Sequence, residues 1–252
     1  MINNKKIALQ ILSLLDLTSL NDADTEDDIR NLCNKAVSEH GSVAAVCVWP
    51  HFVKLAAELL RGTSVKIAAV ANFPEGSINI ESTIKTCKEI IAAGGNEIDV
   101  VFPYKAFLSG NKAIGAQLVS ACKQVCGDNV RLKVILETGE LENASLIKEA
   151  SKIALENGAD FIKTSTGKVP TSATPKAAKA MLEILKETSS NAGFKAAGGI
   201  KDIETATKYL IIADEIMGKK WVSPETFRFG ASGILDSLVA ALSTEVSLRK
   251  NL

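Results

Sequence analysis

Short runs of β-branched and apolar residues alternate with amphipathic segments along most of the chain. Six runs stand out, each followed by a helical pattern, and they cover residues 43–49, 66–73, 97–103, 132–139, 161–167 and 193–199. Between them, segments such as 79–93, 143–157 and 175–188 repeat apolar residues at a spacing near 3.6. Two weaker runs lie at 213–218 and 227–233, and the first is short enough to be the end of a helix. The pattern predicts six βα units and favours two more.

This alternation predicts an α/β fold with a single parallel sheet. The connections are short and no Pro/Gly/Ser-rich linker interrupts them, so we expect one domain over residues 1–252. Eight repeats favour the closed form of such a sheet, the (β/α)8 TIM barrel. The apolar run within residues 1–17 is broken by Gln10, Ser13 and Asp16 and lacks a small-residue cleavage site. It predicts an extra N-terminal helix rather than a secretion signal.

Composition and charge limit the classes of partner. Apolar residues make up 46% of the 252 residues and charged residues 23%, the balance of a globular protein with a sizeable core. Lys plus Arg and Asp plus Glu are equal at 29 each, so no bulk positive field exists to bind nucleic acid or an anionic membrane. No apolar stretch approaches the roughly 18 residues of a membrane span. The five cysteines form no C-x-x-C pair, which favours reduced thiols in the cytoplasm.

Charged side chains fall on the strand faces that we expect to line the barrel. Side chains alternate along a strand, and the more apolar set of each strand is expected to meet the helices. The remaining sets, on four consecutive strands, contain the charged residues Glu97, Asp99, Lys133, Glu137, Lys163 and Lys195. Barrel interiors normally hold branched aliphatics, and a buried charge is costly unless it is paired. The cluster is therefore either a structural salt-bridge network or a site of chemistry.

Two lysines at similar depth, Lys163 and Lys195, favour the chemical interpretation, because like charges do not stabilise a core. At the reference pKa of about 10.4, only about one lysine in 2,500 is neutral at pH 7. Burial and a nearby ammonium group both lower a lysine pKa. Only the neutral amine attacks a carbonyl carbon. The pair therefore predicts a Schiff-base nucleophile, with Asp99 carrying protons through a bound water.

Three glycine turns follow predicted strands at the end where barrel enzymes place their sites. They contain Gly167 with Lys168, Gly198 with Gly199, and Ser232 within Gly-Ala-Ser-Gly. Free backbone N–H groups at such turns and at helix N-termini bind phosphate, although turn geometry alone explains any one of them. Three on one rim predict a phosphate site. His40 and His51 have no partners at ligand spacing, so no metal site is expected.

Seven strings in the chain resemble deoxyribose-phosphate aldolase. They are LLDLT (14–18), VCVWP (46–50), EIDVVFPY (97–104), LKVILETGEL (132–141), DFIKTSTGK (160–168), GFKAAGGI (193–200) and FRFGAS (227–232). They occur in collinear order over nearly the whole chain, and DFIKTSTGK is highly specific. The resemblance implies a (β/α)8 barrel that reversibly cleaves 2-deoxy-D-ribose 5-phosphate to acetaldehyde and D-glyceraldehyde 3-phosphate. It also implies that no metal or organic cofactor takes part.

The resemblance assigns a role to each residue that matches its motifs. Lys163 is the Schiff-base lysine, Lys195 lowers its pKa and aids proton transfer, and Asp99 exchanges protons through water. These three roles coincide with those inferred from the residues alone. Asp16 and Thr18 match positions near the sugar hydroxyl groups. Phosphate binding carries over to Gly167, Lys168, Gly198, Gly199 and Ser232.

The chain departs from the family pattern in places that affect these roles. Ala196 stands where many members have Pro, Lys201 where Arg is frequent, and Gly233 where a second Ser is common. Phosphate affinity is therefore expected to differ. Some members also carry a C-terminal tail ending in a tyrosine that assists proton exchange. This chain has no aromatic residue after Phe229, so that assistance is expected to be absent.

Two rival functions remain at this point. One is a non-catalytic barrel that binds a sugar phosphate, and the lysine pair argues against it. The other is a different Schiff-base enzyme on the same fold, and the matching strings argue against that. The expected partners are a small phosphorylated sugar and aldehydes. A homodimer is the assembly that we expect. The expected setting is deoxyribose catabolism in the cytoplasm.

Overall fold

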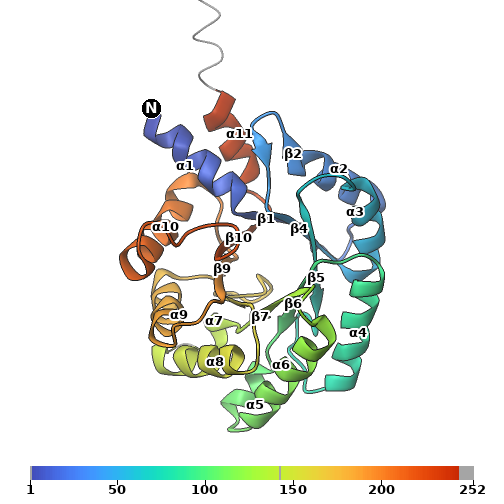
Figure 1. Ribbon diagram of the computed structural model, residues 1–252, viewed down its shortest axis with the longest axis vertical. Helices are drawn as coiled ribbons and strands as arrows, with labels where there is room; N and C mark the ends of the chain where they lie inside the picture. The colour runs from blue at the N-terminus through green and yellow to red at the C-terminus, as the bar shows by residue number, and fades with distance from the viewer. Residues whose placement is uncertain (1, 142, 244–252) are drawn as a thin grey trace, which may run out of the picture.

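Eight parallel strands close into a barrel, and helices surround it (Figure 1). The computed structural model describes residues 2–141 and 143–243, so the C-terminal tail lies outside the described residues. The strands run around the barrel in the order β1-β10-β9-β8-β7-β6-β5-β4, and β4 pairs back with β1. This confirms the (β/α)8 barrel that the sequence predicts. The barrel strands are β1 (Leu15–Thr18), β4 (Ala45–Val48), β5 (Lys66–Ala71), β6 (Glu97–Val101), β7 (Arg131–Ile135), β8 (Phe161–Lys163), β9 (Gly193–Ala197) and β10 (Phe227–Ala231).

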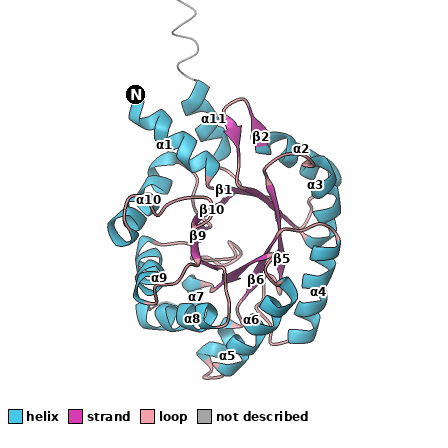
Figure 2. Cartoon of the chain, viewed as in Figure 1, coloured by secondary structure: helices cyan, strands magenta, loops and turns pink. Residues whose placement is uncertain are grey.

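The helices form an outer ring around these strands (Figure 2). α1 is the extra N-terminal helix and packs against α10 and α11. A hairpin of β2 (Val37–Ser38) and β3 (Gly41–Ser42) and the short 3-10 helix η1 (Pro50–Phe52) lie between barrel elements. The α-helices are α1 (Ile2–Ser13), α2 (Glu26–Ala36), α3 (Val53–Leu59), α4 (Ile80–Ala92), α5 (Tyr104–Leu108), α6 (Ala113–Cys126), α7 (Thr138–Leu141), α8 (Ala144–Glu156), α9 (Pro175–Glu187), α10 (Ile203–Met217) and α11 (Leu235–Ser243).

Polar side chains at N-cap positions explain where several outer helices begin. Each accepts a hydrogen bond from a backbone N–H of the first turn, which satisfies a donor that has no partner within the helix. The caps are Asn79 for α4, Asn143 for α8, Thr174 for α9 and Asp202 for α10. The first three helices match the segments that apolar spacing predicts. Asp202 begins α10 close to the Gly198-Gly199 turn.

Two predicted elements are wrong, and each has a physical reason. Residues 213–218 are the end of α10 and its C-cap, because buried Ala206, Tyr209, Leu210 and Ala213 continue one helical face. The eighth strand is instead β1, within the N-terminal segment that we interpreted as all helix. A charged residue in a short apolar run does not indicate a strand, so the sequence pattern at Asp16 favours a helix. In the barrel its carboxylate points to buried cations.

The apolar core lies between the barrel and the ring of helices. Outward-facing strand residues such as Ile98, Val100, Leu132 and Val134 are fully buried in it. The five cysteines are also buried, and none is in a disulfide. In residues 2–141 and 143–243, no helix has the length and apolar character needed to cross a membrane. Apolar packing therefore occupies the outer layer and leaves the barrel interior for charged residues.

Candidate active site

Neighbouring strands present their inward side chains at matching levels. Asp99 on β6 pairs in register with Lys133 on β7, and Lys163 on β8 pairs with Lys195 on β9. Residues paired in register have their side chains on the same face of the sheet. All four side chains are buried. The structure therefore brings together the charged residues that strand alternation placed inside the barrel.

Asp99 lies at the centre of this group and contacts three ammonium groups. Its Oδ2 atom is 2.8 Å from Nζ of Lys163 and 2.8 Å from Nζ of Lys195. Its Oδ1 atom is 2.9 Å from Nζ of Lys133. Because the Lys163 and Lys195 amines share one oxygen atom, the charge of one acts directly on the other. One carboxylate thus bridges the two lysines that the sequence singled out.

A second layer of ion pairs lies below Asp99, toward the N-terminal ends of the strands. Asp16 Oδ1 is 2.6 Å from Nη1 of Arg228, and its Oδ2 is 2.5 Å from Nζ of Lys195. Glu97 Oε1 is 2.9 Å from Nη2 of Arg228, and its Oε2 is 2.5 Å from Nζ of Lys133. Each carboxylate therefore binds at least two cations. Lys133 and Lys195 also contact Asp99, so this layer is joined to the one above it, and each of its buried charges has a partner.

The buried part of the network, to which the half-buried Arg131 adds a further contact with Glu97, holds one more cation than it has carboxylates. Its cations are Lys133, Lys163, Lys195 and Arg228, and its carboxylates are Asp16, Glu97 and Asp99. Lys133 contacts all three carboxylates, and Lys195 contacts two of them. Lys163 contacts only Asp99 among the described residues. The lysine with the least compensation is therefore the one nearest the open end of the barrel.

The pKa values follow from this uneven pairing. Burial lowers the pKa of Lys163 below its ordinary value; the Asp99 carboxylate opposes this, and the Lys195 ammonium adds to the lowering. Burial alone would also lower the pKa of Lys195, but Asp16 and Asp99 outweigh it and raise that pKa. Burial would raise the pKa of Asp99, yet Lys133, Lys163 and Lys195 together hold it well below its usual range. Lys163 is thus the amine that most readily becomes neutral.

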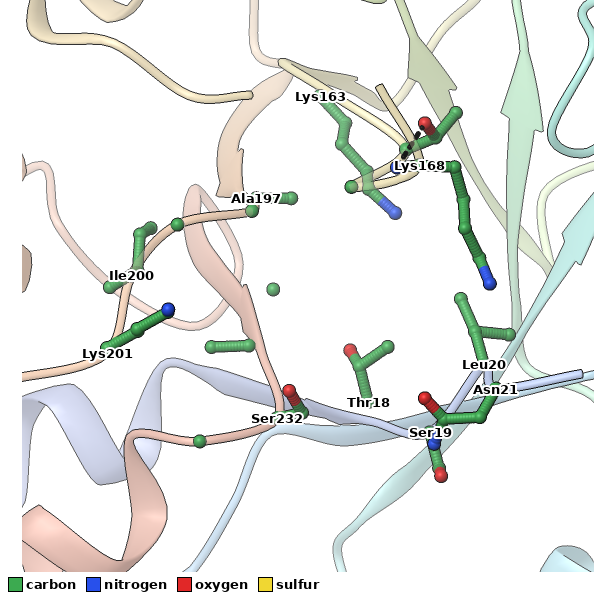
Figure 3. Close-up of a pocket in the computed structure, with 17 residues that line it drawn as sticks. Thr18, Ser19, Leu20, Asn21, Lys163, Lys168, Ala197, Ile200, Lys201 and Ser232 are labelled. Atoms are coloured by element: carbon green, nitrogen blue, oxygen red, sulfur yellow. Dashed lines mark hydrogen bonds between the residues drawn. The ribbon is translucent and has the colours of Figure 1, made fainter. Parts of the chain in front are cut away.

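A cavity of about 440 Å³ opens above Lys163 (Figure 3). The Lys163 side chain points into it, and Lys168, Lys201 and Ser232 stand around its edge. Its lining comes from the C-terminal ends of β1, β8, β9 and β10 and from the loops after them. The predicted contact residues that line it are Thr18, Gly167, Lys168, Gly198, Gly199 and Ser232. The three glycine turns therefore meet on one rim, as expected.

Asp16, Asp99 and Lys195 do not line this cavity. They are fully buried beneath it, where Lys195 is held between the two carboxylates. Gly230 makes room for this lysine, because a Cβ at that position would lie 2.9 Å from Lys195 Cε. For Asp16, a direct contact with sugar hydroxyl groups stays a prediction. In this structure Asp16 forms ion pairs with Lys195 and Arg228.

The rim glycines adopt backbone angles that favour glycine. Gly167, Gly198 and Gly199 have φ values of 81°, 85° and 77°. In this region other residues are strained, and a turn of this kind exposes successive backbone N–H groups. Lys201 and Gly233, two of the departures from the family pattern, also line the cavity. Both substitutions therefore lie where they can alter an anion site.

Sequence reasoning missed two parts of the site. Arg228 was overlooked because the run FRFGASG drew attention only through its glycines, although alternation with Gly230 would have placed it inward. The loop after β1, with Ser19 and Asn21, and Thr166 also line the cavity. No periodic signal marks loop residues, so these could not be found from the pattern. In residues 2–141 and 143–243, no group of three His, Cys, Asp or Glu residues is arranged to hold a metal ion.

Comparison with known families identifies the family to which the chain is similar. A family model described as DeoC/LacD family aldolase matches residues 10–221. The matched span includes Asp99, Lys163 and Lys195, and it ends before β10. The match therefore covers most of the barrel and the segments that contain all three catalytic candidates.

Solved structures of similar fold cover nearly the whole chain. A protein from Coccidioides immitis, assigned as a deoxyribose-phosphate aldolase, is 30% identical with a TM-score of 0.81, over 91% of this chain and 85% of that one. The apo form of a protein from Toxoplasma gondii ME49 with the same assignment is 25% identical with a TM-score of 0.89, over 97% and 98%. The tetrameric deoxyribose phosphate aldolase from Aeropyrum pernix is 25% identical with a TM-score of 0.71, over 98% of each chain.

Proposed function

We propose, from the premise that this chain belongs to the DeoC/LacD family of aldolases, that it is a deoxyribose-phosphate aldolase. It would reversibly cleave 2-deoxy-D-ribose 5-phosphate to acetaldehyde and D-glyceraldehyde 3-phosphate through a Schiff base on Lys163. One observation carries the proposal: the least compensated buried lysine lies at the floor of a cavity that three glycine turns border. An amine with a lowered pKa and an adjacent anion site suit a phosphorylated carbonyl substrate.

The proposed reaction begins when neutral Lys163 attacks the C1 carbonyl of the open-chain sugar. Loss of water gives a protonated imine, which accepts electrons as the bond between C2 and C3 breaks. The C3 hydroxyl loses its proton and becomes the aldehyde of glyceraldehyde 3-phosphate. The enamine left on Lys163 is then protonated at C2, and water releases acetaldehyde.

Asp99 is suited to hold the proton that leaves the C3 hydroxyl, directly or through water. Its low pKa depends on three neighbouring cations, one of which is Lys163. When the imine becomes an enamine, the nitrogen of Lys163 loses its positive charge, and the proton affinity of Asp99 rises. Lys195 stays charged between Asp16 and Asp99 throughout, because its raised pKa keeps the proton on it. It is then the fixed charge that keeps Lys163 deprotonated.

Release of acetaldehyde from 2-deoxyribose 5-phosphate tests the proposal. We expect turnover that is insensitive to a metal chelator and that needs no added cofactor. Turnover of ketose phosphates without cleavage of this substrate would favour a different Schiff-base aldolase. If the ligand raises the melting temperature but no aldehyde appears, the barrel binds sugar phosphate without catalysis.

The setting of the reaction is also part of the proposal. We propose a role in deoxyribose catabolism in the cytoplasm, with small phosphorylated sugars and aldehydes as partners. The tetramer described for the Aeropyrum pernix protein belongs to that protein. For this chain a homodimer stays the prediction, and size-exclusion chromatography with light scattering would check it.

A further inference from the structure

Glu137 is a buried carboxylate outside the ion-pair network. Its side chain is fully buried just beyond the end of β7. No lysine, arginine or histidine of the described residues forms an ion pair with it. Burial raises its pKa, and hydrogen bonds from Thr166 oppose that rise. Carboxylates are seldom fully buried without a cation, so the position requires an explanation.

The backbone at Glu137 is also unusual. Its φ is 57°, a left-handed value that a residue with a long side chain rarely adopts. This turn ends the strand alternation and redirects the side chain, so Glu137 does not join Lys133 in the interior network as expected. Strained residues of this kind persist where the surrounding structure requires them, and they cluster at functional sites.

Among residues 2–141 and 143–243, every hydrogen bond of the carboxylate comes from Thr166, in the loop after β8. The backbone N–H of Thr166 donates to Oε1 at 3.2 Å, and the Thr166 hydroxyl donates to Oε2 at 2.5 Å. The same hydroxyl accepts a hydrogen bond from the backbone N–H of Lys168 at 3.0 Å. Thr166, Gly167 and Lys168 all line the cavity. Figure 3 shows the Lys168 side chain extending along the edge of the cavity toward Leu20.

Gly167 needs such a restraint from outside the loop. Its φ is 81°, and no atom lies within 4 Å of the position a Cβ would take, so the turn faces open space. A glycine in open space has wide conformational freedom, and the loop loses entropy when it binds an anion. A carboxylate that fixes the residue before Gly167 reduces that loss in advance.

We propose that Glu137 is a positioning residue that holds the Thr166–Lys168 turn ready for the phosphate group of the substrate. The proposal rests on the proposed function and deepens it, because it makes Glu137 a determinant of preference for phosphorylated over free sugars. It acts through Thr166 and touches no reacting atom. Its removal therefore affects binding of the phosphate end and leaves the imine chemistry intact.

Kinetics with paired substrates test this role. For Glu137→Met, which keeps the side-chain length but removes the acceptor oxygens, we expect KM for deoxyribose 5-phosphate to rise about ten-fold with kcat nearly unchanged. Glu137→Gln keeps one acceptor oxygen and should give a smaller rise, which also guards against misfolding of the Met variant. For unphosphorylated deoxyribose, kcat/KM should not change in either variant. Glu140→Gln, an exposed position on α7, is the matched control.

The partner side is tested at Thr166. Thr166→Val removes the hydroxyl group and should raise KM for deoxyribose 5-phosphate as Glu137→Met does. Thr166→Ser keeps the hydroxyl group and should have a KM near that of the wild-type protein. The Glu137→Met/Thr166→Val double variant should have a KM no higher than that of either single variant. A parallel loss of activity on phosphorylated and free sugars would overturn the proposal, since it would show an effect on Lys163. An unchanged KM would overturn it too.

Binding of inorganic phosphate, measured by calorimetry, separates this proposal from the proposed function. If the wild-type protein does not cleave deoxyribose 5-phosphate, the proposed function fails, whatever Glu137 does. The positioning role then still predicts weaker phosphate binding by Glu137→Met than by Glu140→Gln. Equal phosphate binding by these two variants contradicts the role of Glu137 and leaves the aldolase proposal standing.

Discussion

The two ends of the barrel interior contain similar charged side chains but differ in how completely these charges are paired. In the lower layer, Glu97 and Asp16 each bind at least two cations, and Arg228 is held between them. At the upper end, Lys163 has one carboxylate, which it shares with two other lysines. The pKa of Arg228, in the lower layer, is raised, whereas the pKa of Lys163, at the upper end, is lowered. Full pairing fixes a charge, whereas incomplete pairing leaves an amine ready to react.

This contrast separates the residues that support the barrel from the residue that we propose as the nucleophile. Lys163 and Lys195 lie in register on adjacent strands, yet their pKa values move in opposite directions. Asp16 makes the difference, because it contacts Lys195 and not Lys163. Substitutions at these positions should therefore divide into effects on activity and effects on stability.

The largest effect is expected from Lys163→Ala. Removal of the nucleophile should lower kcat on the order of 10⁴-fold or more. The free energy of unfolding should change by no more than about 2 kcal/mol, because Asp99 keeps Lys133 and Lys195 as partners. Steady-state kinetics and urea unfolding check both parts. Retained turnover would remove Lys163 from the mechanism.

Lys195→Leu should impair both activity and stability. We expect kcat to fall about 10²- to 10³-fold, because the charge that keeps Lys163 neutral is lost. The variant should also lose about 3–5 kcal/mol of stability, since Asp16 and Asp99 each lose a buried partner. Urea unfolding of both lysine variants compares them directly. Equal stability of the two variants would contradict the distinction between them.

The pH dependence of kcat/KM reports the pKa of Lys163 in the free enzyme. Only the neutral amine reacts, so kcat/KM should rise with pH through this pKa, with a midpoint below the ordinary lysine value of 10.5. In Lys195→Leu, a neighbouring positive charge is gone and the midpoint should move to higher pH. A midpoint that stays in place would show that burial alone lowers the pKa of Lys163.

A smaller effect is expected at the rim. Lys168 is partly exposed, and its ammonium lies 3.4 Å from the Asp22 carboxylate. Lys168→Met should raise KM for deoxyribose 5-phosphate about five- to ten-fold and leave kcat within about two-fold, because solvent screens this charge. Unphosphorylated deoxyribose is the control substrate. A fall in kcat on both sugars would place Lys168 in the chemistry instead.

Sequence reasoning succeeded where the period of the structure fixes the direction of side chains. Alternation along β6 to β9 correctly predicts that Asp99, Lys133, Lys163 and Lys195 point into the barrel. It failed at β1, because a strand of four residues directly after a helix carries too little periodic signal. It failed also at 213–218, where a short apolar run fits both a strand and the last turn of a helix.

The loops show a different limit of the sequence. Glycine turns indicated the rim, but the contact between Glu137 and Thr166 joins the segments that follow β7 and β8, and it depends on a left-handed backbone turn at Glu137. Strand alternation predicts the wrong direction for Glu137, because the strand ends at Ile135. Such contacts depend on tertiary packing, which no local pattern encodes. The charged residues inside the barrel were therefore easier to predict than the contacts that hold the loops at the rim.

The measurement that tests the central claim most directly is borohydride trapping with 2-deoxyribose 5-phosphate. Reduction of the imine fixes the substrate carbon to the lysine, and mass spectrometry of the peptide containing Lys163 locates it. We predict a reduced adduct on Lys163, absent from Lys163→Ala and formed more slowly in Lys195→Leu. An adduct on Lys195 would exchange the roles of the two lysines. No adduct from protein that cleaves the substrate would contradict the Schiff-base mechanism.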